Sequence, residues 1–169
     1  MPSDPAGVTG PGTDAAPDWR SATARDLPIL RRAQSETFAS MRGRAPTAEE
    51  TARMDAATRE ALNDPGQTIE AAQRDGLVCA YYWLRGLTER DPFLVDLHVL
   101  PGHRRAGLGR LCLERALRRA AEAGADRIAL SVAPGNAPAL ALYRRHGART
   151  LAATGDAILL ALPVPAQSP

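Results

Sequence analysis

The sequence predicts one α/β domain in which helices cover both faces of a central sheet. Its 169 residues suffice for a single domain with a sizeable core. The content of 44% apolar, 24% charged and 4% aromatic residues is typical of a globular chain with an aliphatic interior. Short strand-like runs alternate with helical patterns, which favours an α/β arrangement. Residues 1–17 and 164–169 lack such patterns and are expected to be a disordered and a flexible tail, which leaves 18–163 as the domain.

The N-terminal half is expected to contain three strands and two helices. Asp26 is the predicted N-cap of the first helix, and one face of that helix carries Leu30, Ala33, Thr37 and Met41. Thr47 and Glu50 form a Thr-x-x-Glu capping box that starts the second helix. In order, we expect a strand at 19–23, a helix at 26–41, a helix from Thr47 to Asp64, and strands at 67–73 and 77–85 joined by a tight turn.

The C-terminal half is expected to contain four strands and two helices. The run 127–132 shows little alternation, which is typical of a strand in the middle of a sheet covered on both faces. The helix before it ends at Gly124 and carries a buried stripe formed by Leu113, Ala116, Leu117 and Ala120. In order, we expect a strand at 93–100, a helix at 107–123, a strand at 127–132, a helix at 136–147, and strands at 148–153 and 157–162.

Charge is unevenly distributed along the chain. The net charge is only +2, which argues against a dedicated nucleic-acid binder. Residues 101–150 nevertheless carry 10 arginines against 3 acidic residues. All 21 basic residues are arginines, which we attribute to a compositional bias. We therefore expect a local basic surface in this segment and no nucleic-acid partner.

The composition also excludes several kinds of site. Cys79 and Cys112 have no ligand-like spacing, so neither a disulfide framework nor a metal site is expected. No run approaches 18 apolar residues, and the N-terminus lacks the basic start and apolar stretch of a signal peptide. We therefore expect a cytoplasmic protein that does not associate with a membrane.

The most informative stretch is the loop at 101–107, which follows a strand and leads directly into a helix. A helix N-terminus presents unpaired backbone N–H groups and a partial positive charge, and glycines let a phosphate approach the backbone. Arg104, Arg105 and Arg110 add positive charge there. A tight turn would explain Gly-x-Gly alone, but with these arginines we favour a phosphate site. The absence of lysine excludes a P-loop, and Cys112 stands where a dinucleotide fingerprint requires glycine.

Two segments together resemble the GNAT superfamily of acyl-CoA-dependent N-acyltransferases. Residues 104–109 match its R/Q-x-x-G-x-G/A signature, and residues 136–147 are similar to its N-x-x-A-x-x-x-Y-x-x-x-G segment. Ala148 departs from the aromatic residue that is common after the last glycine. The resemblance implies a mixed sheet of six or seven strands with about four helices on both faces. It also implies an N-acetyltransferase that transfers acetyl from acetyl-CoA directly to a primary amine in a ternary complex.

The resemblance also implies roles for individual residues. Backbone groups of the loop would bind the pyrophosphate of acetyl-CoA, and strand residues Leu97 and Val99 would pair with its pantetheine arm. Tyr143 would stand near the sulfur as general acid, and the Val99 N–H would stabilise the oxyanion. The implied cofactor-binding residues are Leu97, Val99, Arg104, Arg105, Ala106, Gly107, Leu108, Gly109, Arg110, Asn136 and Tyr143; no metal is implied.

The general base and the acceptor site are less determined. Alternation along the strand at 93–100 puts Asp96 and His98 on one face, opposite Val95, Leu97 and Val99. Either Asp96 or His98 could take the amine proton, and His98 has the better intrinsic pKa. Taken separately, each is slightly better explained without catalysis, as a structural histidine or a solvated aspartate. An acidic lining for a cationic amine, or merely a solvated helix face, is offered by Glu49, Glu50, Asp55, Glu60 and Asp64.

Three residues, Tyr81, Tyr82 and Trp83, could form a wall of the acceptor pocket or belong to the core. A non-catalytic acyl-CoA sensor of the same fold stays open as an alternative to the enzyme, and a homodimer is possible.

Overall fold

The structure, a computed structural model, describes residues 16–166. The N-terminal half consists of β1 (Asp18–Ser21), a 3₁₀ turn (Ala24–Asp26), α1 (Leu27–Arg42), α2 (Ala48–Ala61), β2 (Thr68–Arg74) and β3 (Leu77–Arg85). The C-terminal half consists of β4 (Phe93–Val99), a 3₁₀ turn (Pro101–His103), α3 (Leu108–Glu122), β5 (Arg127–Val132), α4 (Ala137–Arg145), β6 (Arg149–Ala153) and β7 (Ile158–Pro163). Within the described residues, the expected seven strands and four α-helices are confirmed.

The strands form one mixed sheet in the order β1-β2-β3-β4-β5-β7-β6. Every neighbouring pair is antiparallel except β4 and β5, which are parallel. The predicted tight turn joins β2 to β3, with Asp75 and Gly76 in the left-handed region. Strand β5 lies between β4 and β7, but its burial alternates: Ile128, Leu130 and Val132 are buried, whereas Arg127 and Ser131 are exposed. The expectation that both faces of this strand are covered is therefore wrong.

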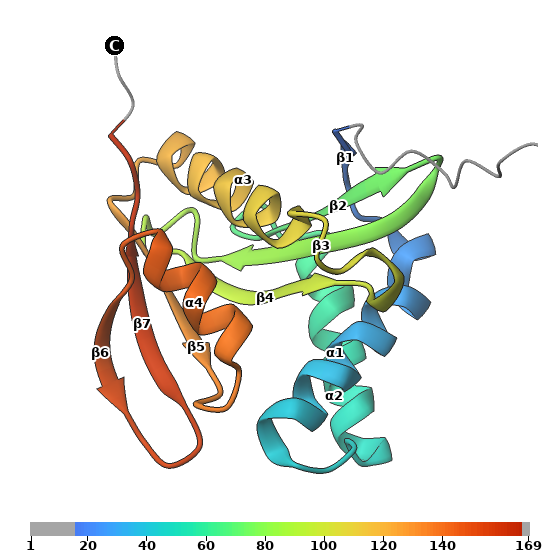
Figure 1. Cartoon of the computed structure of the whole chain (residues 1–169). Helices are drawn as coiled ribbons and strands as arrows, with labels where there is room; N and C mark the ends of the chain where they lie inside the picture. The colour runs from blue at the N-terminus through green and yellow to red at the C-terminus, as the bar shows by residue number, and fades with distance from the viewer. Residues whose placement is uncertain (1–15, 167–169) are drawn as a thin grey trace, which may run out of the picture.

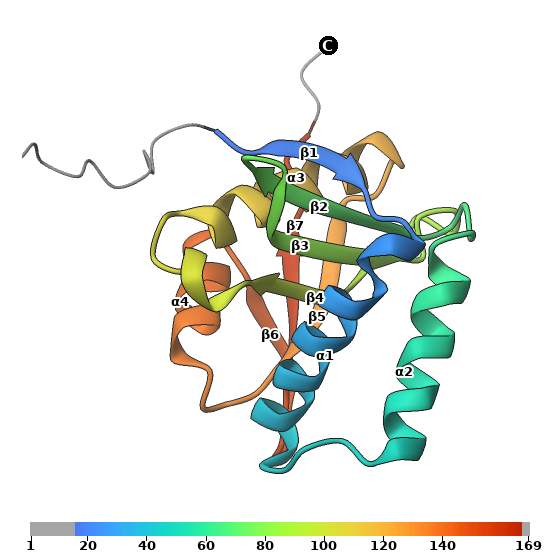
Figure 2. The same ribbon diagram turned by 90° about the vertical axis from the view of Figure 1, so that its right-hand side faces the viewer.

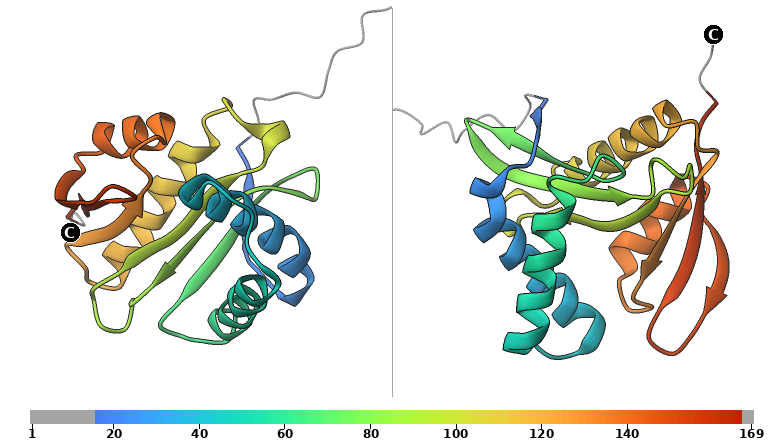
Figure 3. Two further views of the ribbon diagram at one scale, coloured as in Figure 1. Left: turned by 90° about the horizontal axis from the view of Figure 1, so that it is seen from below. Right: turned by 180° about the vertical axis from the view of Figure 1, so that it is seen from behind.

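Helices cover both faces of this sheet. Helices α1 and α2 lie on one face, and α3 and α4 lie on the other (Figures 1 and 2). The same layering is seen from below and from behind (Figure 3). The buried stripe of α3 contacts the face that carries Tyr82 and Leu84, whereas Leu30 and Ala33 of α1 pack with Tyr81 and Trp83. Because alternate strand residues point to opposite faces, β3 contributes to both cores.

Strands β4 and β5 separate soon after they begin (Figure 1). Their parallel register contains only Phe93–Ala129 and Leu94–Leu130. A bulge leaves Val95 without a partner on β3, because Trp83 pairs with Asp96 and Leu84 pairs with Leu94. The regular alternation predicted for this strand is therefore interrupted at Val95. Leu94 shares the α3-side core with Leu97 and Val99, and Val95 is exposed.

The two N-terminal helices begin differently. The Thr47–Glu50 capping box is confirmed, since Thr47 accepts from the Glu50 N–H and Glu50 accepts from the Thr47 N–H. Asp26 is the N-cap residue of α1, as predicted, but its carboxylate makes no cap hydrogen bond to that helix. It accepts instead from Arg20 and from the Thr23 N–H. Pro28 stands at the second position of α1 and has no N–H to offer a capping carboxylate.

The expected tails fall mostly on residues 1–15 and 167–169, which lie outside the described residues. Next to the domain, Pro17 is buried. The Val164 N–H donates to the Asp126 carbonyl over 2.9 Å.

Candidate active site

The separation of β4 from β5 leaves part of the β4 backbone without a partner strand on that side. The Leu100 N–H donates to Cys79 on β3 over 3.0 Å. Because backbone groups alternate in direction along a strand, those of Leu97 and Val99 point away from β3, toward β5. The register with β5 has already ended at Leu94, within the part of the chain that the structure describes. These two residues can therefore pair with an extended ligand as if it were an added strand.

The loop before α3 fits an anion. Gly107 is the N-cap of α3 in the left-handed conformation, and as a glycine it has no side chain to cap the helix. The first intrahelical bond runs from the Leu111 N–H to Gly107 over 3.2 Å, so the N–H groups of Leu108, Gly109 and Arg110 precede it. A Cβ atom on Gly107 would meet nothing within 4 Å, which leaves the approach to these groups open. This is the arrangement by which helix N-termini bind phosphate.

The three arginines of this region have different surroundings. Arg105 is exposed, has a positive φ of 65°, and forms no ion pair within residues 16–166. Arg110 lies 3.5 Å from Glu114, one helical turn away. Arg104 turns back toward β4, where its Nε donates to the Val99 carbonyl over 3.0 Å. Arg104 is therefore held against β4, whereas Arg105 is not tied to another side chain within the described residues.

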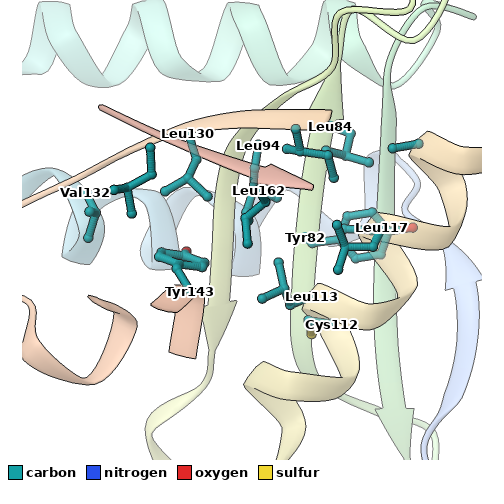
Figure 4. Close-up of a cluster of buried hydrophobic side chains, with 14 of the residues drawn as sticks. Tyr82, Leu84, Leu94, Cys112, Leu113, Leu117, Leu130, Val132, Tyr143 and Leu162 are labelled. Carbon is teal, nitrogen blue, oxygen red and sulfur yellow. The ribbon is translucent and has the colours of Figure 1, made fainter. Parts of the chain in front are cut away.

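Helix α4 places Tyr143 against the apolar core near the β4–β5 separation. Asn136 caps α4 by accepting from the Ala139 N–H over 3.2 Å, so its side-chain oxygen is used by the helix. The Tyr143 ring packs below Leu130 and Val132 (Figure 4). Burial and then the negative charge of Asp96 raise the pKa of Tyr143, so the phenol keeps its proton at neutral pH.

The opposite face of β4 carries a buried polar cluster, which we define as Asp96, His98, Tyr81 and Thr37. Asp96 accepts hydrogen bonds from the Tyr81 hydroxyl and from Thr37. His98 stacks on Tyr81 with ring centroids 6.1 Å apart, and its Nδ1 lies 3.5 Å from the Thr37 hydroxyl. The structure therefore brings both predicted base candidates together beneath α1.

Burial moves the pKa values of the two candidates in opposite directions. It raises the pKa of the Asp96 carboxyl, although the hydrogen bond from Tyr81 acts in the opposite sense. It lowers the pKa of His98 below 6.5, although the charges of Asp96 and Glu36 oppose this. His98 is consequently neutral at pH 7, and its buried Nε2 has no hydrogen-bond partner among the described residues. A neutral imidazole with a free ring nitrogen can accept a proton.

The sequence did not reveal two contributors to this region. Thr37 was expected on the apolar face of the first helix, and a hydroxyl in that stripe was the available signal. Glu36 had no signal, because its role depends on α1 crossing β4. Its carboxylate lies 3.4 Å from His98 Nε2 and 3.4 Å from Arg104.

The acidic residues of α2 that were considered for an acceptor lining are mostly engaged with neighbours. Glu50 pairs with Arg44, Asp55 with Arg31, and Glu49 with Arg53. Asp64 accepts from the Gly66 N–H and from Gln67 in the following turn. Tyr81 belongs to the polar cluster, whereas Tyr82 lies in the other core.

Two surface hollows lie away from these residues. One, of about 510 Å³, is lined by Ala22, Thr23, Ala24, Leu27, Arg59, Leu62 and Asn63. The other, of about 600 Å³, lies beside α3 and is lined by Glu114, Leu117, Arg118, Ala121, Glu122, His146, Pro165 and Ala166. Neither contains the loop glycines, the free β4 backbone or the polar cluster, so we place the candidate site by those groups. Among residues 16–166, no cluster of three or more His, Cys, Asp or Glu residues could hold a metal ion. In the same range, no helix is both long and apolar enough to cross a membrane.

Comparison with known proteins gives consistent results. Mycothiol acetyltransferase from Clavibacter sepedonicus is 35% identical over 102 residues, which are 59% of this chain and 32% of that protein. Streptothricin acetyltransferase from Streptomyces lavendulae is 46% identical over 52 residues, 31% of this chain and 28% of that protein. The chain thus spans less than two thirds of either relative's length.

Solved structures share the fold over most of the chain. The PaiA N-acetyltransferase from Thermoplasma acidophilum, in complex with coenzyme A, has a TM-score of 0.71 at 15% identity. The similarity covers 88% of this chain and 99% of that one. The acetyltransferase (GNAT) family itself matches residues 29–148, which include both motifs identified in the sequence. These matches confirm the predicted resemblance and do not favour the non-catalytic alternative. The chain belongs to the acetyltransferase (GNAT) family.

Proposed function

We propose that this protein is an N-acetyltransferase that transfers the acetyl group of acetyl-CoA to a primary amine in one step within a ternary complex. The proposal rests on the arrangement of three features of the chain. An uncapped helix N-terminus, a free length of β4 backbone and a neutral buried histidine lie along one connected stretch, residues 96–110. Membership of the acetyltransferase family and a structural neighbour with coenzyme A support the choice of donor.

The donor-binding residues follow from backbone geometry. The N–H groups from Arg105 to Arg110 would hold the pyrophosphate, with the arginine side chains adding positive charge; those of Leu108, Gly109 and Arg110 precede the first intrahelical bond. The backbone groups of Leu97 and Val99 would pair with the pantetheine arm. Asn136 would contact the same arm through its amide N–H₂, because its oxygen already caps α4. Acetyl-CoA supplies the acetyl group as a thioester.

Four groups of the chain would then contribute to the reaction. His98 takes a proton from the attacking amine, since its Nε2 is free and its neutral form prevails at pH 7. Asp96 holds the cluster, because both Tyr81 and Thr37 donate to it. Tyr143 gives its retained proton to the departing sulfur, and the Val99 N–H stabilises the oxyanion. Overall, an amide bond forms and the carbon–sulfur bond breaks. The proton that His98 takes from the amine replaces, through solvent, the one that Tyr143 gives to the sulfur, so a neutral amine releases no net proton and an ammonium releases one.

The acceptor is an amine, and its identity is the part of the proposal that most needs experiment. The names of the mycothiol and streptothricin acetyltransferases describe acceptors of those proteins. We propose a cytoplasmic location, which suits the free, buried thiols of Cys79 and Cys112. A homodimer remains a prediction.

The test measures free thiol released from acetyl-CoA over a panel of small aliphatic amines, aromatic amines and peptides with free N-termini. We expect amine-dependent release with at least one member. Calorimetry with acetyl-CoA runs in parallel. Binding without turnover on any amine would favour the sensor, and no binding would overturn the assignment of the donor.

A further inference from the structure

Glu36 holds a position that its neighbours on α1 do not share. It lies on the side of α1 that crosses β4, and its side chain is about one-third exposed (36%). Its Oε2 atom lies 3.4 Å from His98 Nε2 and 3.4 Å from Arg104 Nη2, and its Oε1 lies 3.6 Å from Arg32. One carboxylate oxygen thus faces both the free nitrogen of the buried histidine and a cation.

The cation beside Glu36 comes from the loop that precedes α3. The Arg104 guanidinium donates to the Val99 carbonyl over 3.0 Å and reaches Glu36 with its other end. Its side chain is more than half exposed (53%), and an exposed pair of this kind contributes little stability. A ligand cation can therefore replace Arg104 at small cost.

The second observation that points to a ligand is the buried imidazole. The His98 side chain is only 9% exposed, and its Nε2 makes no hydrogen bond within the described residues although it faces Glu36. The other buried side-chain nitrogens in that condition belong to guanidinium groups, of Arg74 and Arg119, which cannot accept a proton. An unpaired buried acceptor costs free energy, so its presence calls for an explanation such as a ligand that binds it.

From this geometry we propose that Glu36 and His98 Nε2 form a binding site for the acceptor's ammonium group. The inference rests on the proposed acetyl transfer and names its substrate class, amines that are protonated at neutral pH. Glu36 binds the ammonium as a counter-ion, in the place that Arg104 occupies in the free protein. One N–H bond of the ammonium breaks and its proton goes to His98 Nε2. The amine keeps the electron pair, and Glu36 stabilises the imidazolium until the proton leaves to solvent.

The coupling between Glu36 and His98 can be measured without any acceptor. The chain has 3 histidines, so imidazole resonances can be assigned by removing each in turn and followed by NMR against pH. The groups facing His98 are Glu36 from α1, Tyr81 from β3, Asp96 from its own strand and Arg104 from the loop. We expect Glu36→Gln to move the His98 midpoint to lower pH, because it removes a negative charge.

Glu49→Gln is the matched control. Glu49 lies 3.4 Å from Arg53 on α2, an exposed ion pair of the same length that faces no buried ring. We expect its removal to leave the His98 midpoint unchanged. Glu36→Asp keeps the charge one methylene further back and should give an intermediate midpoint. An unchanged midpoint in both Glu36 variants, with thermal melts showing folded protein, would overturn the inference.

Kinetics then test the substrate class. With an aliphatic amine that the panel shows to be acetylated, Glu36→Gln should raise KM about tenfold through loss of one charge-assisted hydrogen bond. With an aromatic amine, which is neutral at pH 7, KM should change less than twofold. Equal changes for both amines would refute the ammonium site while leaving acetyl transfer established. Absence of turnover in the unaltered protein would instead contradict the proposed function.

Discussion

The two faces of the sheet bury different kinds of side chain. The α3–α4 face is an apolar core, and its buried carboxylate, Glu70, is satisfied by Arg115 and Tyr82. The α1–α2 face has a smaller apolar core and buries Asp96 and His98. There the His98 ring keeps one nitrogen without a partner among residues 16–166. We infer that the α3–α4 face, the donor face, supports acetyl-CoA binding through backbone groups. The α1–α2 face, the acceptor face, takes the proton of the amine through side chains.

The largest effect should come from blocking the backbone of the donor side. Gly107→Trp forces a side chain into a left-handed conformation (φ 74°) and into the open space before α3. We expect acetyl-CoA affinity to fall about 1,000-fold, because at least two charge-assisted contacts to phosphate are lost. Isothermal calorimetry with acetyl-CoA measures this change in affinity.

Gly43 provides the matched control for backbone strain. It has a φ of 68°, its Cβ would also meet nothing within 4 Å, and it lies at the far end of α1. Gly43→Trp should destabilise the fold to a similar degree and leave acetyl-CoA binding intact. Equal loss of binding in both variants would mean that strain, rather than blockage of the site, causes the effect.

A second, smaller effect separates two buried tyrosines on the donor face. Tyr143→Phe should lower kcat about 100-fold, since it removes the proposed acid, and leave acetyl-CoA affinity unchanged. Tyr82→Phe removes the hydrogen bond to Glu70 (2.8 Å) and should cost about 2 kcal/mol of stability with kcat retained. Thiol-release assays measure kcat and denaturant unfolding measures stability, so together they distinguish the two variants. If Tyr82→Phe lowered kcat as much as Tyr143→Phe, the assignment of Tyr143 would fail.

The pH dependence of turnover tests the acceptor face. The neutral form of His98 is the proton acceptor, so kcat falls as pH drops through its pKa, about tenfold for each unit below the midpoint. Because burial lowers that pKa, the loss should begin below 6.5. Glu36, Asp96 and Arg104 also set the midpoint. His98→Gln should remove this limb, and an unchanged pH profile in the variant would assign the base to another group.

The groups of the proposed donor side are more visible in the sequence than those of the proposed acceptor side, for a physical reason. Phosphate binding at a helix N-terminus depends on a contiguous loop, and residues 104–109 express it as a short motif. The seven strands, the four helices and the Thr47–Glu50 box were likewise predictable because they depend on local spacing and caps.

The acceptor side depends on contacts between distant segments. Glu36 and His98 are 62 positions apart and meet only because α1 crosses β4. The local sequence did not indicate the bulge at Val95 either. Because of this bulge, Leu94 lies in the same core as Leu97. The missing cap hydrogen bond of Asp26 has a related cause, because the Asp26 carboxylate accepts instead from Arg20 on β1.

The smallest effect concerns the acidic residues of α2, which we expect to stabilise the fold and not to bind the acceptor. Arg44 and the Thr47 N–H lower the pKa of Glu50 from 4.5 to about 2. Its stabilising contribution is therefore complete above pH 4.5 and is lost as pH falls from 4.5 toward 2. Glu50→Gln should lower Tm at pH 7 by about 2–3 °C through loss of the capping box, and the difference from the unaltered protein should shrink near pH 2. KM for the amine should stay constant, as it should in Glu60→Gln. A rise in KM confined to Glu50→Gln would move the acceptor site from the Glu36 side of α1 to α2.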